Sequence, residues 1–280
     1  MPETDDYLVP QDAYTDGFSR VYDIFMDEVP YDRWAERILR NLKRYATDDG
    51  APERKILCDL GCGTGQMTRR MAEAGYDCIG VDLSEDMLSE AMQEEGNHPK
   101  NILYVNQDMC SLDLCGCAGQ MISCCDSVNY LLTEEEMGEM LRGVCEFLLP
   151  GGLFVFDFNT LHKYRDTMGE KTIAENRTNE SFVWENCFYD TVDNEEDPEH
   201  PLKNINTCSV TFYLRHGDTD LFSRSMESHW QRGWTMEEIA DLLAENGFAL
   251  LEAVDDETDA PPTQDAERIV ITAKKTGEQT

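Results

Sequence analysis

The chain has 280 residues, of which 41% are apolar, so it can bury about three quarters of the surface that its unfolded form exposes and build one large domain with an insertion. It carries 57 acidic and 23 basic residues, a formal net charge of −34. Affinity for a phosphate backbone depends on Lys and Arg that displace counterions, so this charge argues against nucleic acid as a partner. The acidic first residues and the absence of an apolar run of about 18 residues argue against a signal peptide or a membrane span. We therefore expect a cytoplasmic monomer or homodimer with no membrane partner.

The eleven cysteines are expected to be reduced thiols, because several of them, such as Cys58 and Cys78, lie in apolar, strand-like runs. A zinc site would need paired C-x-x-C motifs or a matching second half. Cys115 and Cys117, with Cys110 nearby, offer neither. No metal is expected.

Residues 1–50 are predicted to form an N-terminal helical cap. Its apolar residues recur at helical spacing before the break at 48–52, namely Tyr31, Trp34, Ile38 and Leu42. The opposite face is basic and is predicted to be solvated: Arg33, Arg37, Arg40, Lys43 and Arg44.

Residues 56–65 are the most informative stretch of the chain, because an apolar strand there runs into three glycines at alternate positions where a helix begins. These glycines are Gly61, Gly63 and Gly65. Glycine tolerates a positive φ and, lacking a Cβ, allows a ligand to touch the backbone itself. This pattern predicts a cofactor loop.

A second strand over 77–82 ends in Asp82, 23 residues after Asp59. A carboxylate in that place can hold a ribose through its hydroxyls, so the two segments together predict nucleoside binding. The dinucleotide motif G-x-G-x-x-G would need a third glycine where this chain has Gln66. A pyrophosphate loop is therefore disfavoured.

Residues 54–160 alternate strands and helices, which predicts βαβ units and a parallel sheet. Ser84 can cap a helix that runs to about residue 95, and Thr133 with Glu136 forms a capping box for the next helix. Residues 153–158 are then a buried strand.

Residues 171–233 break this alternation. Three segments with period-two patterning predict antiparallel strands: 182–189, 208–215 and 222–231. The alternating pattern resumes at a helix from Thr235 to about residue 247, followed by strands over 248–254 and 268–273. A sheet inserted there lies near the carboxyl ends of the parallel strands, where ligands bind in open α/β sheets, so it is predicted to be a lid and a substrate wall.

The motif at 59–65, an acid followed by G-x-G-x-G, resembles the first motif of the class I S-adenosylmethionine-dependent methyltransferases. The resemblance continues in order through 81–84, 106–109 and 148–152. It implies an α/β, Rossmann-like methyltransferase fold with a mostly parallel seven-stranded sheet flanked by helices. It also implies S-adenosyl-L-methionine as the cofactor and S-adenosyl-L-homocysteine as the product.

The whole chain is similar to the bacterial small-molecule methyltransferases with a Tyr-Asp-x-Phe-Met N-terminal cap and an inserted β lid, relatives of glycine and sugar-amine N-methyltransferases. The matching segments are 13–14, 21–26, 30–34, 126–131, 156–159, 182–186 and 229–232. The family usually has Phe-Asp at the start of the fourth strand, where residues 117–120 read Cys-Ala-Gly-Gln, so the start of this strand is left open. The resulting division is a cap over 1–50, a methyltransferase domain over 51–170 and 234–280, and a lid over 171–233.

The resemblance assigns nucleoside contacts to five residues. Asp82 would bind both ribose hydroxyls, Asp108 would accept the adenine N6 hydrogens, and the Met109 amide would support the ring edge. Leu83 and Met87 would sandwich adenine, although a buried Met at helical spacing serves equally well as core.

The methionine end of the cofactor is assigned to Asp59 and to the Gly61 backbone, because its ammonium needs an acceptor. Resemblance to the glycine methyltransferases adds four residues around the same group: Tyr14, Tyr22, Cys124 and Tyr130. Core packing alone would explain each of these four equally well.

Methyl transfer requires the protein to align a nucleophile with the S–CH₃ bond, to exclude water and, where needed, to remove a proton. Alternation places Glu227 and His229 on one face of a lid strand, where His229 could be a base oriented by Glu227. The alternative is a polar, solvent-facing side of the sheet. Asp126 and Asn159 are further catalytic candidates, since both lie at carboxyl ends of predicted parallel strands.

Three functions remain open. The cofactor motifs, the lid and the acidic surface favour a methyltransferase acting on a small-molecule acceptor, and an amine would suit the negative field. A tRNA or DNA methyltransferase would need a basic groove and, for exocyclic amines, an Asn-Pro-Pro-aromatic turn, where residues 126–129 read Asp-Ser-Val-Asn. A non-catalytic S-adenosylmethionine-binding protein would be expected to have lost some glycines, and these are complete.

Overall fold

The computed structural model describes residues 14, 22–23, 25–194 and 197–276. Much of the N-terminal cap predicted over 1–50, including residues 1–13 and 15–21, lies outside this part of the chain. Within the described residues, no helix is both long and apolar enough to cross a membrane.

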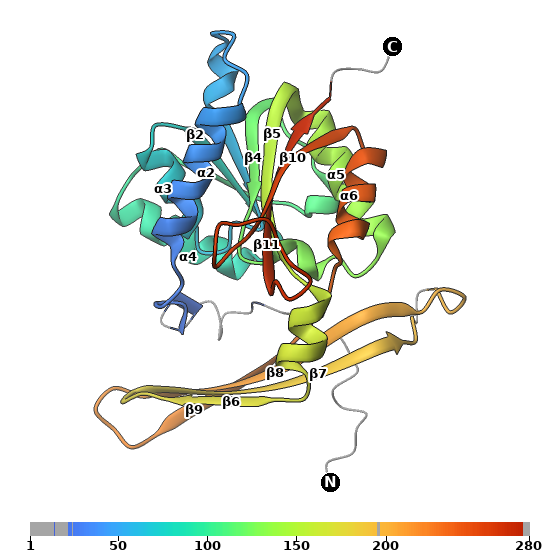
Figure 1. The fold of residues 1–280 in the computed structure, drawn as a ribbon. Coiled ribbons are helices and arrows are strands. Elements are labelled where there is room, and N and C mark those ends of the chain that lie inside the picture. The colour runs from blue at the N-terminus through green and yellow to red at the C-terminus, as the bar shows by residue number, and fades with distance from the viewer. Residues whose placement is uncertain (1–13, 15–21, 24, 195–196, 277–280) are drawn as a thin grey trace.

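The core of the molecule is a seven-stranded sheet in the order β10-β11-β5-β4-β1-β2-β3, in which only β11 runs against its neighbours (Figure 1). Its strands are β1 (Ile56–Leu60), β2 (Asp77–Asp82), β3 (Leu103–Asn106), β4 (Ala118–Ser123), β5 (Leu148–Asn159), β10 (Phe248–Asp255) and β11 (Arg268–Lys275). The predicted fold class is confirmed.

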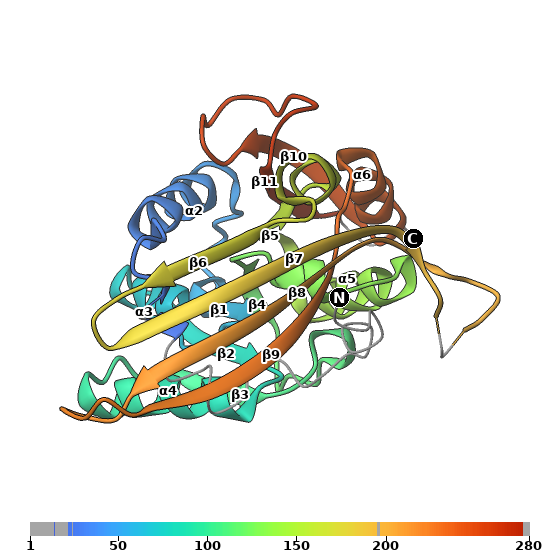
Figure 2. The same cartoon turned by 90° about the horizontal axis from the view of Figure 1, so that it is seen from below.

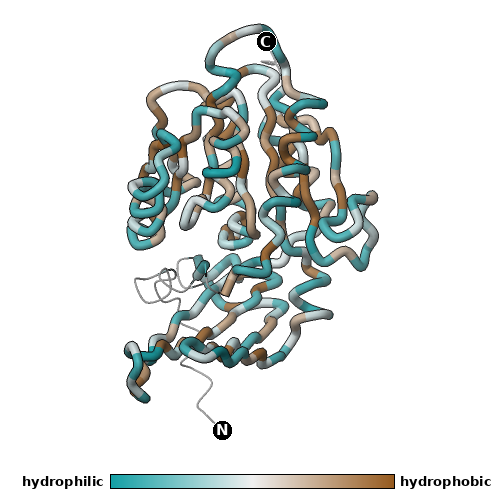
Figure 3. Tube along the Cα trace, turned by 90° about the vertical axis from the view of Figure 1, so that its left-hand side faces the viewer, coloured by the Kyte–Doolittle hydropathy of each residue, from teal (hydrophilic) through white to brown (hydrophobic). Residues whose placement is uncertain are grey.

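Helices cover both faces of this sheet. Helices α2 (Tyr31–Tyr45) and α3 (Gln66–Glu73) pack on one face, and α5 (Glu134–Phe147) and α6 (Met236–Glu245) on the other; α4 (Glu85–Asn97) contacts β2 and β3. Apolar segments concentrate along the strands between these helices, while the outer helix surfaces are hydrophilic (Figure 3). The predicted apolar face of α2 is buried against the sheet.

The capping signals define where three helices begin. Thr133 with Glu136 and Thr235 with Glu238 form complete capping boxes at α5 and α6, and the Ser84 hydroxyl accepts the Met87 amide at 3.2 Å at α4. These three predictions are confirmed. Each cap satisfies backbone donors that the first turn of a helix leaves without a partner.

The fourth strand, whose start the sequence left open, begins at Ala118. Gly119 lies directly against the backbone of Arg54, because a Cβ at this glycine would lie 2.5 Å from the Arg54 Cα. Close approach of two backbones therefore accounts for glycine at this position.

Residues 172–232 form a second, antiparallel sheet in the order β6-β7-β8-β9, which lies across one end of the core sheet (Figures 1 and 2). Its strands are β6 (Thr172–Asn176), β7 (Glu180–Val192), β8 (Leu202–Arg215) and β9 (Phe222–Arg232). The short, largely exposed β6 was not predicted, because it has no alternating burial.

The second sheet is attached at the carboxyl ends of β4 and β5. Gln231 of β9 donates to the Asp126 carboxylate at 2.8 Å, and the Asn129 side chain donates to the carbonyl of Arg232 at 2.7 Å. Thr160, directly after β5, pairs with Trp234. These contacts hold the sheet over the end of the core where ligands bind in such folds.

The prediction that the basic face of α2 is solvated is wrong for Arg37, which is only 2% exposed. Its guanidinium donates to Asp259 at 2.7 Å and to Asp256 at 2.5 Å. The loop after β10 folds back onto the helix and covers this arginine. A helix-periodicity argument misses the contact because its partners lie more than 200 residues away.

Candidate functional site

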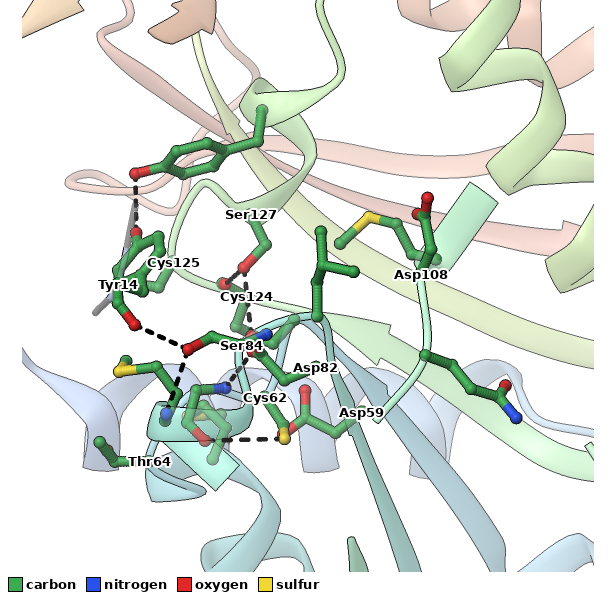
Figure 4. A pocket seen from close by; sticks show the side chains of 18 of the residues that line it. Tyr14, Asp59, Cys62, Thr64, Asp82, Ser84, Asp108, Cys124, Cys125 and Ser127 are labelled. Carbon is green, nitrogen blue, oxygen red and sulfur yellow. Dashed lines mark hydrogen bonds between the residues drawn. The ribbon is translucent and has the colours of Figure 1, made fainter. Parts of the chain in front are cut away.

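A cavity of about 600 Å³ opens at the carboxyl ends of the parallel strands (Figure 4). Its walls come from the segments that follow four strands: 61–64 after β1, 82–87 at the end of β2, 107–110 after β3 and 124–127 after β4. Asp108 and Tyr14 lie on opposite sides of the cavity, and Asp59 and Asp82 lie between them. Its volume lies within the range of small-molecule sites.

Twelve of the thirteen residues predicted to bind cofactor line this cavity: Tyr14, Tyr22, Asp59, Gly61, Gly63, Asp82, Leu83, Met87, Asp108, Met109, Cys124 and Tyr130. The exception is Gly65, which has a φ of 79° and is the N-cap of α3. A Cβ at Gly65 would collide with the Tyr104 hydroxyl, so this glycine is needed for local packing.

The glycine loop exposes its backbone to the cavity. Gly61 has a φ of 65°, and a Cβ there would lie 2.7 Å from the Cβ of Ser127. Gly63 has a φ of 54°. Both conformations are ones that side-chain-bearing residues rarely adopt.

Asp82, at the end of β2, binds the backbone of the glycine loop that follows β1. Its two carboxylate oxygens accept the Gly63 amide at 2.7 Å and the Ser84 amide at 2.8 Å. Burial raises the pKa of Asp82, and these backbone amides oppose the rise. Each carboxylate oxygen keeps a second lone pair for a further donor.

Asp59 is fully buried at the end of β1 and accepts the Thr68 hydroxyl at 2.6 Å. Burial raises the pKa of Asp59 to about 7, with the Thr68 hydrogen bond opposing the rise. The group is thus a carboxyl whose charge changes close to neutral pH, and it faces the cavity.

Apolar side chains line the cavity beside Asp82. Leu83 is 70% exposed at the rim, whereas Met87 is buried in α4. Asp108 accepts the Cys110 amide at 2.8 Å and so caps the short helix that carries Met109.

Tyr14 connects three parts of the molecule. Its amide donates to Glu227 of β9 at 2.9 Å, its carbonyl accepts the Ser84 hydroxyl at 2.7 Å, and its own hydroxyl lies 2.7 Å from that of Tyr130. The ring centroids of Tyr14 and Tyr22 are 6.0 Å apart in an edge-on arrangement. Aromatic side chains therefore line one end of the cavity.

Asp23 contacts the glycine loop, and the sequence analysis did not predict this role. Its carboxylate accepts the Thr64 hydroxyl at 2.7 Å and the Gln66 amide at 2.9 Å. It fastens the segment that carries Tyr22 onto the glycine loop. The Tyr-Asp pair at 22–23 was noted only as part of a family motif.

His229 lies behind the tyrosines and not in the cavity wall. Its Nδ1 is 3.0 Å from the Tyr130 hydroxyl, and its Nε2 is 3.5 Å from the Glu227 carboxylate. The alternative of a solvent-facing side is wrong, because Glu227, His229 and Gln231 are 2%, 4% and 5% exposed. Burial lowers the pKa of His229 to about 4, opposed by the charge of Asp126.

Asp126 and Asn159 also lie outside the cavity wall. The Asp126 carboxylate accepts Arg268 at 2.5 Å and Gln231 at 2.8 Å. The Asn159 side chain donates to the Tyr164 hydroxyl and accepts from Lys163, both at 2.9 Å. Catalytic roles for Asp126, Asn159 and His229 remain predictions.

The cavity wall is acidic. Its acidic members are Asp59, Asp82, Glu85, Asp86, Asp108 and Glu136, and among the described residues that line it none is Lys, Arg or His. Glu85 and Asp86, which were not predicted, lie three and four residues after Asp82 in the chain, and this short spacing was the available signal. Ser127 and Glu136 reach the wall only through the folding of the segment after β4.

Residues 57–152 match the methyltransferase domain family. A Bacillus subtilis protein named "putative methyltransferase YqeM" is 33% identical over 262 residues, which cover 92% of this chain and 96% of that protein. A dTDP-3-amino-3,4,6-trideoxy-alpha-D-glucopyranose N,N-dimethyltransferase of Streptomyces venezuelae is 35% identical over 106 residues, 38% of this chain and 43% of that enzyme. Among solved structures, an S-adenosylmethionine-dependent methyltransferase from Clostridium acetobutylicum superposes with a TM-score of 0.79 at 25% identity and covers 94% and 99% of the two chains.

Proposed function

This chain belongs to the S-adenosylmethionine-dependent methyltransferases, in one family with the Bacillus subtilis protein, and we propose that it transfers the methyl group to the nitrogen of a small-molecule amine. The relative from Streptomyces venezuelae is named for N,N-dimethylation of an amino sugar, which supports this class of acceptor.

The observation that carries the proposal is the charge of the cavity. Among the described residues, six carboxyl groups and no basic side chain line the cavity. A cavity lined by one sign of charge concentrates ligands of the opposite sign. An amine reaches the enzyme as a cation at neutral pH, whereas an anionic acceptor would be repelled.

The residues in the cavity fit S-adenosylmethionine. Cβ atoms at Gly61 and Gly63 would press on Ser127 and Met87 of the cavity wall, and the second lone pairs of Asp82 suit a ribose diol. We assign the adenine to the side of Leu83, Met87 and Asp108. The Met109 amide is assigned to the adenine as well. The methionine end is assigned to Asp59, to the Gly61 backbone and to the group of Tyr14, Tyr22, Cys124 and Tyr130.

Bound S-adenosylmethionine supplies an electrophilic methyl group on a cationic sulfur. The chain has to place the amine in line with this group and to keep water out. Aromatic faces at this end of the cavity stabilise positive charge without competing as nucleophiles. We assign selection of the acceptor to the sheet of residues 171–233. None of its described residues lines the cavity, but its Glu227 accepts the amide of Tyr14, which does.

A screen of small primary and secondary amines, with release of S-adenosylhomocysteine as the readout, tests the proposal. Mass spectrometry of each product locates the new methyl group, and we expect it on nitrogen. Methylation only at oxygen or carbon, or activity only on tRNA or DNA with a steep loss in salt, would refute the amine assignment.

A further inference from the structure

Four side chains form a continuous series of contacts, of which Tyr14 and Tyr130 line the cavity and His229 and Glu227 lie behind it. The Tyr14 hydroxyl lies 2.7 Å from that of Tyr130, which lies 3.0 Å from His229 Nδ1. His229 Nε2 in turn lies 3.5 Å from Glu227 Oε2, an electrostatic contact and not a hydrogen bond, and the same oxygen accepts the Tyr14 amide at 2.9 Å. The contacts therefore run from the cavity to the second sheet and back to Tyr14.

The chemistry of these groups determines which atom donates the hydrogen in each contact. Glu227 Oε2 accepts a backbone amide, so it acts as an acceptor toward His229 as well. The Nε2 atom that faces it then carries the ring proton, because a lone pair would face the carboxylate unfavourably. In the neutral imidazole Nδ1 is consequently an acceptor, and the Tyr130 hydroxyl has to donate to it.

We propose that Glu227 and His229 hold the Tyr130 hydroxyl as a donor directed away from the cavity, so that the Tyr130 and Tyr14 oxygens present lone pairs to an N–H of the amine acceptor. This inference rests on the proposed function. Tyr14 and Tyr130 contact the acceptor, and both line the cavity. His229 and Glu227 are positioning residues that act through Tyr130.

An N–H held by the tyrosine oxygens leaves the nitrogen lone pair free to point at the methyl group. The arriving ammonium first gives one proton to bulk water, which leaves the neutral amine in the cavity. The new N–CH₃ bond then forms as the S–CH₃ bond breaks, with its electron pair left on sulfur, and the product nitrogen carries the positive charge. Burial raises the pKa values of Tyr14 and Tyr130 well above their ordinary range, so both remain neutral phenols. A neutral phenol takes no proton from an alcohol, and the arrangement therefore favours nitrogen over oxygen as the methylated atom.

The first test needs no acceptor. Nitrogen-15 NMR of the full chain with labelled histidine is expected to find the His229 proton on Nε2 and none on Nδ1 at pH 7. Assignment comes from loss of the signal in His229→Gln, with His216→Gln, a substitution in an exposed turn of the same sheet, as the control. A proton on Nδ1 would overturn the proposal, whatever the acceptor proves to be.

The second test uses an amine that the screen identifies. Tyr130→Phe is expected to lower kcat about tenfold while the Kd of S-adenosylmethionine, measured by calorimetry, stays within about twofold. His229→Leu should lose as much, and His229→Gln should recover to within about threefold of wild type, because a carboxamide oxygen can accept the Tyr130 hydroxyl. Tyr213→Phe, elsewhere in the same sheet, should match wild type.

The outcomes separate the two ideas. Wild-type turnover of an amine by Tyr130→Phe, or equal losses in His229→Leu and His229→Gln, would overturn the hydrogen-bond chain and leave the proposed function standing. If the methyl group is found only on oxygen or carbon, the proposed function fails. The NMR result still decides whether Tyr130 donates its hydroxyl hydrogen to His229.

Discussion

The raised pKa of the buried Asp59 carboxyl predicts that cofactor affinity depends on pH between about 6 and 8, well above the range in which carboxyl groups usually titrate. Its pKa is raised to about 7 by burial, so the ionised fraction is about 0.9 at pH 8 and about 0.1 at pH 6. If the cofactor ammonium binds only the carboxylate form, apparent affinity scales with this fraction. We expect the Kd of S-adenosylmethionine to be about tenfold weaker at pH 6 than at pH 8.

Calorimetry across this range with wild type and Asp59→Asn is the assay. The asparagine can still accept the Thr68 hydroxyl, so packing is preserved, but the variant carries no titrating group there. Its affinity should be weak and should vary little with pH. The pKa of His229, lowered to about 4, places that residue outside the range. A wild-type Kd that is the same at pH 6 and pH 8 would refute the reasoning.

Stability without cofactor should change in the opposite sense. The pKa of Asp59 is higher in the folded chain than in the unfolded one, near 4, so the folded state binds more protons between these values. Stability therefore falls as the pH rises from about 4 to about 7, by up to about 4 kcal/mol for three pKa units. Thermal unfolding of wild type relative to Asp59→Asn should show this loss, and saturating cofactor should reduce it.

Two further substitutions test the cavity. Asp82→Ala should weaken S-adenosylmethionine binding by about 1.5–3 kcal/mol through lost charge-assisted hydrogen bonds, and an unchanged Kd by calorimetry would remove Asp82 from the ribose site. Gly61→Ala should lower the free energy of unfolding by about 1–3 kcal/mol, because its Cβ would meet Ser127 at 2.7 Å in a backbone of positive φ. Chemical denaturation measures that loss. The control is Gly96→Ala in α4, because a Cβ there meets nothing within 4 Å. Equal stability of wild type and Gly61→Ala would contradict the packing argument.

Local chemistry explains why much of the fold was predictable. Capping boxes and glycine turns act within a few residues, so Thr133, Thr235 and the loop at 61–65 could be identified from the sequence. Parallel strands joined by βαβ connections have their carboxyl ends at one edge of the sheet, which places the ends of β1, β2, β3 and β4 together. Ten of the twelve predicted cofactor residues in the cavity wall come from these strand ends, and the other two, Tyr14 and Tyr22, precede the sheet in the chain.

The sequence by itself determined the parallel sheet, the glycine loop, the acid at the end of β2 and the presence of an inserted antiparallel sheet. Tertiary structure alone decided which face of β9 is buried, because period-two alternation gives two faces without saying which one meets the core. It also decided that Arg37 is covered by the loop at 255–259, that Asp23 fastens onto Thr64, and that His229 reaches the cavity only through Tyr130. Each of these contacts joins residues far apart in the chain, and such pairings depend on how whole elements pack and not on any local pattern.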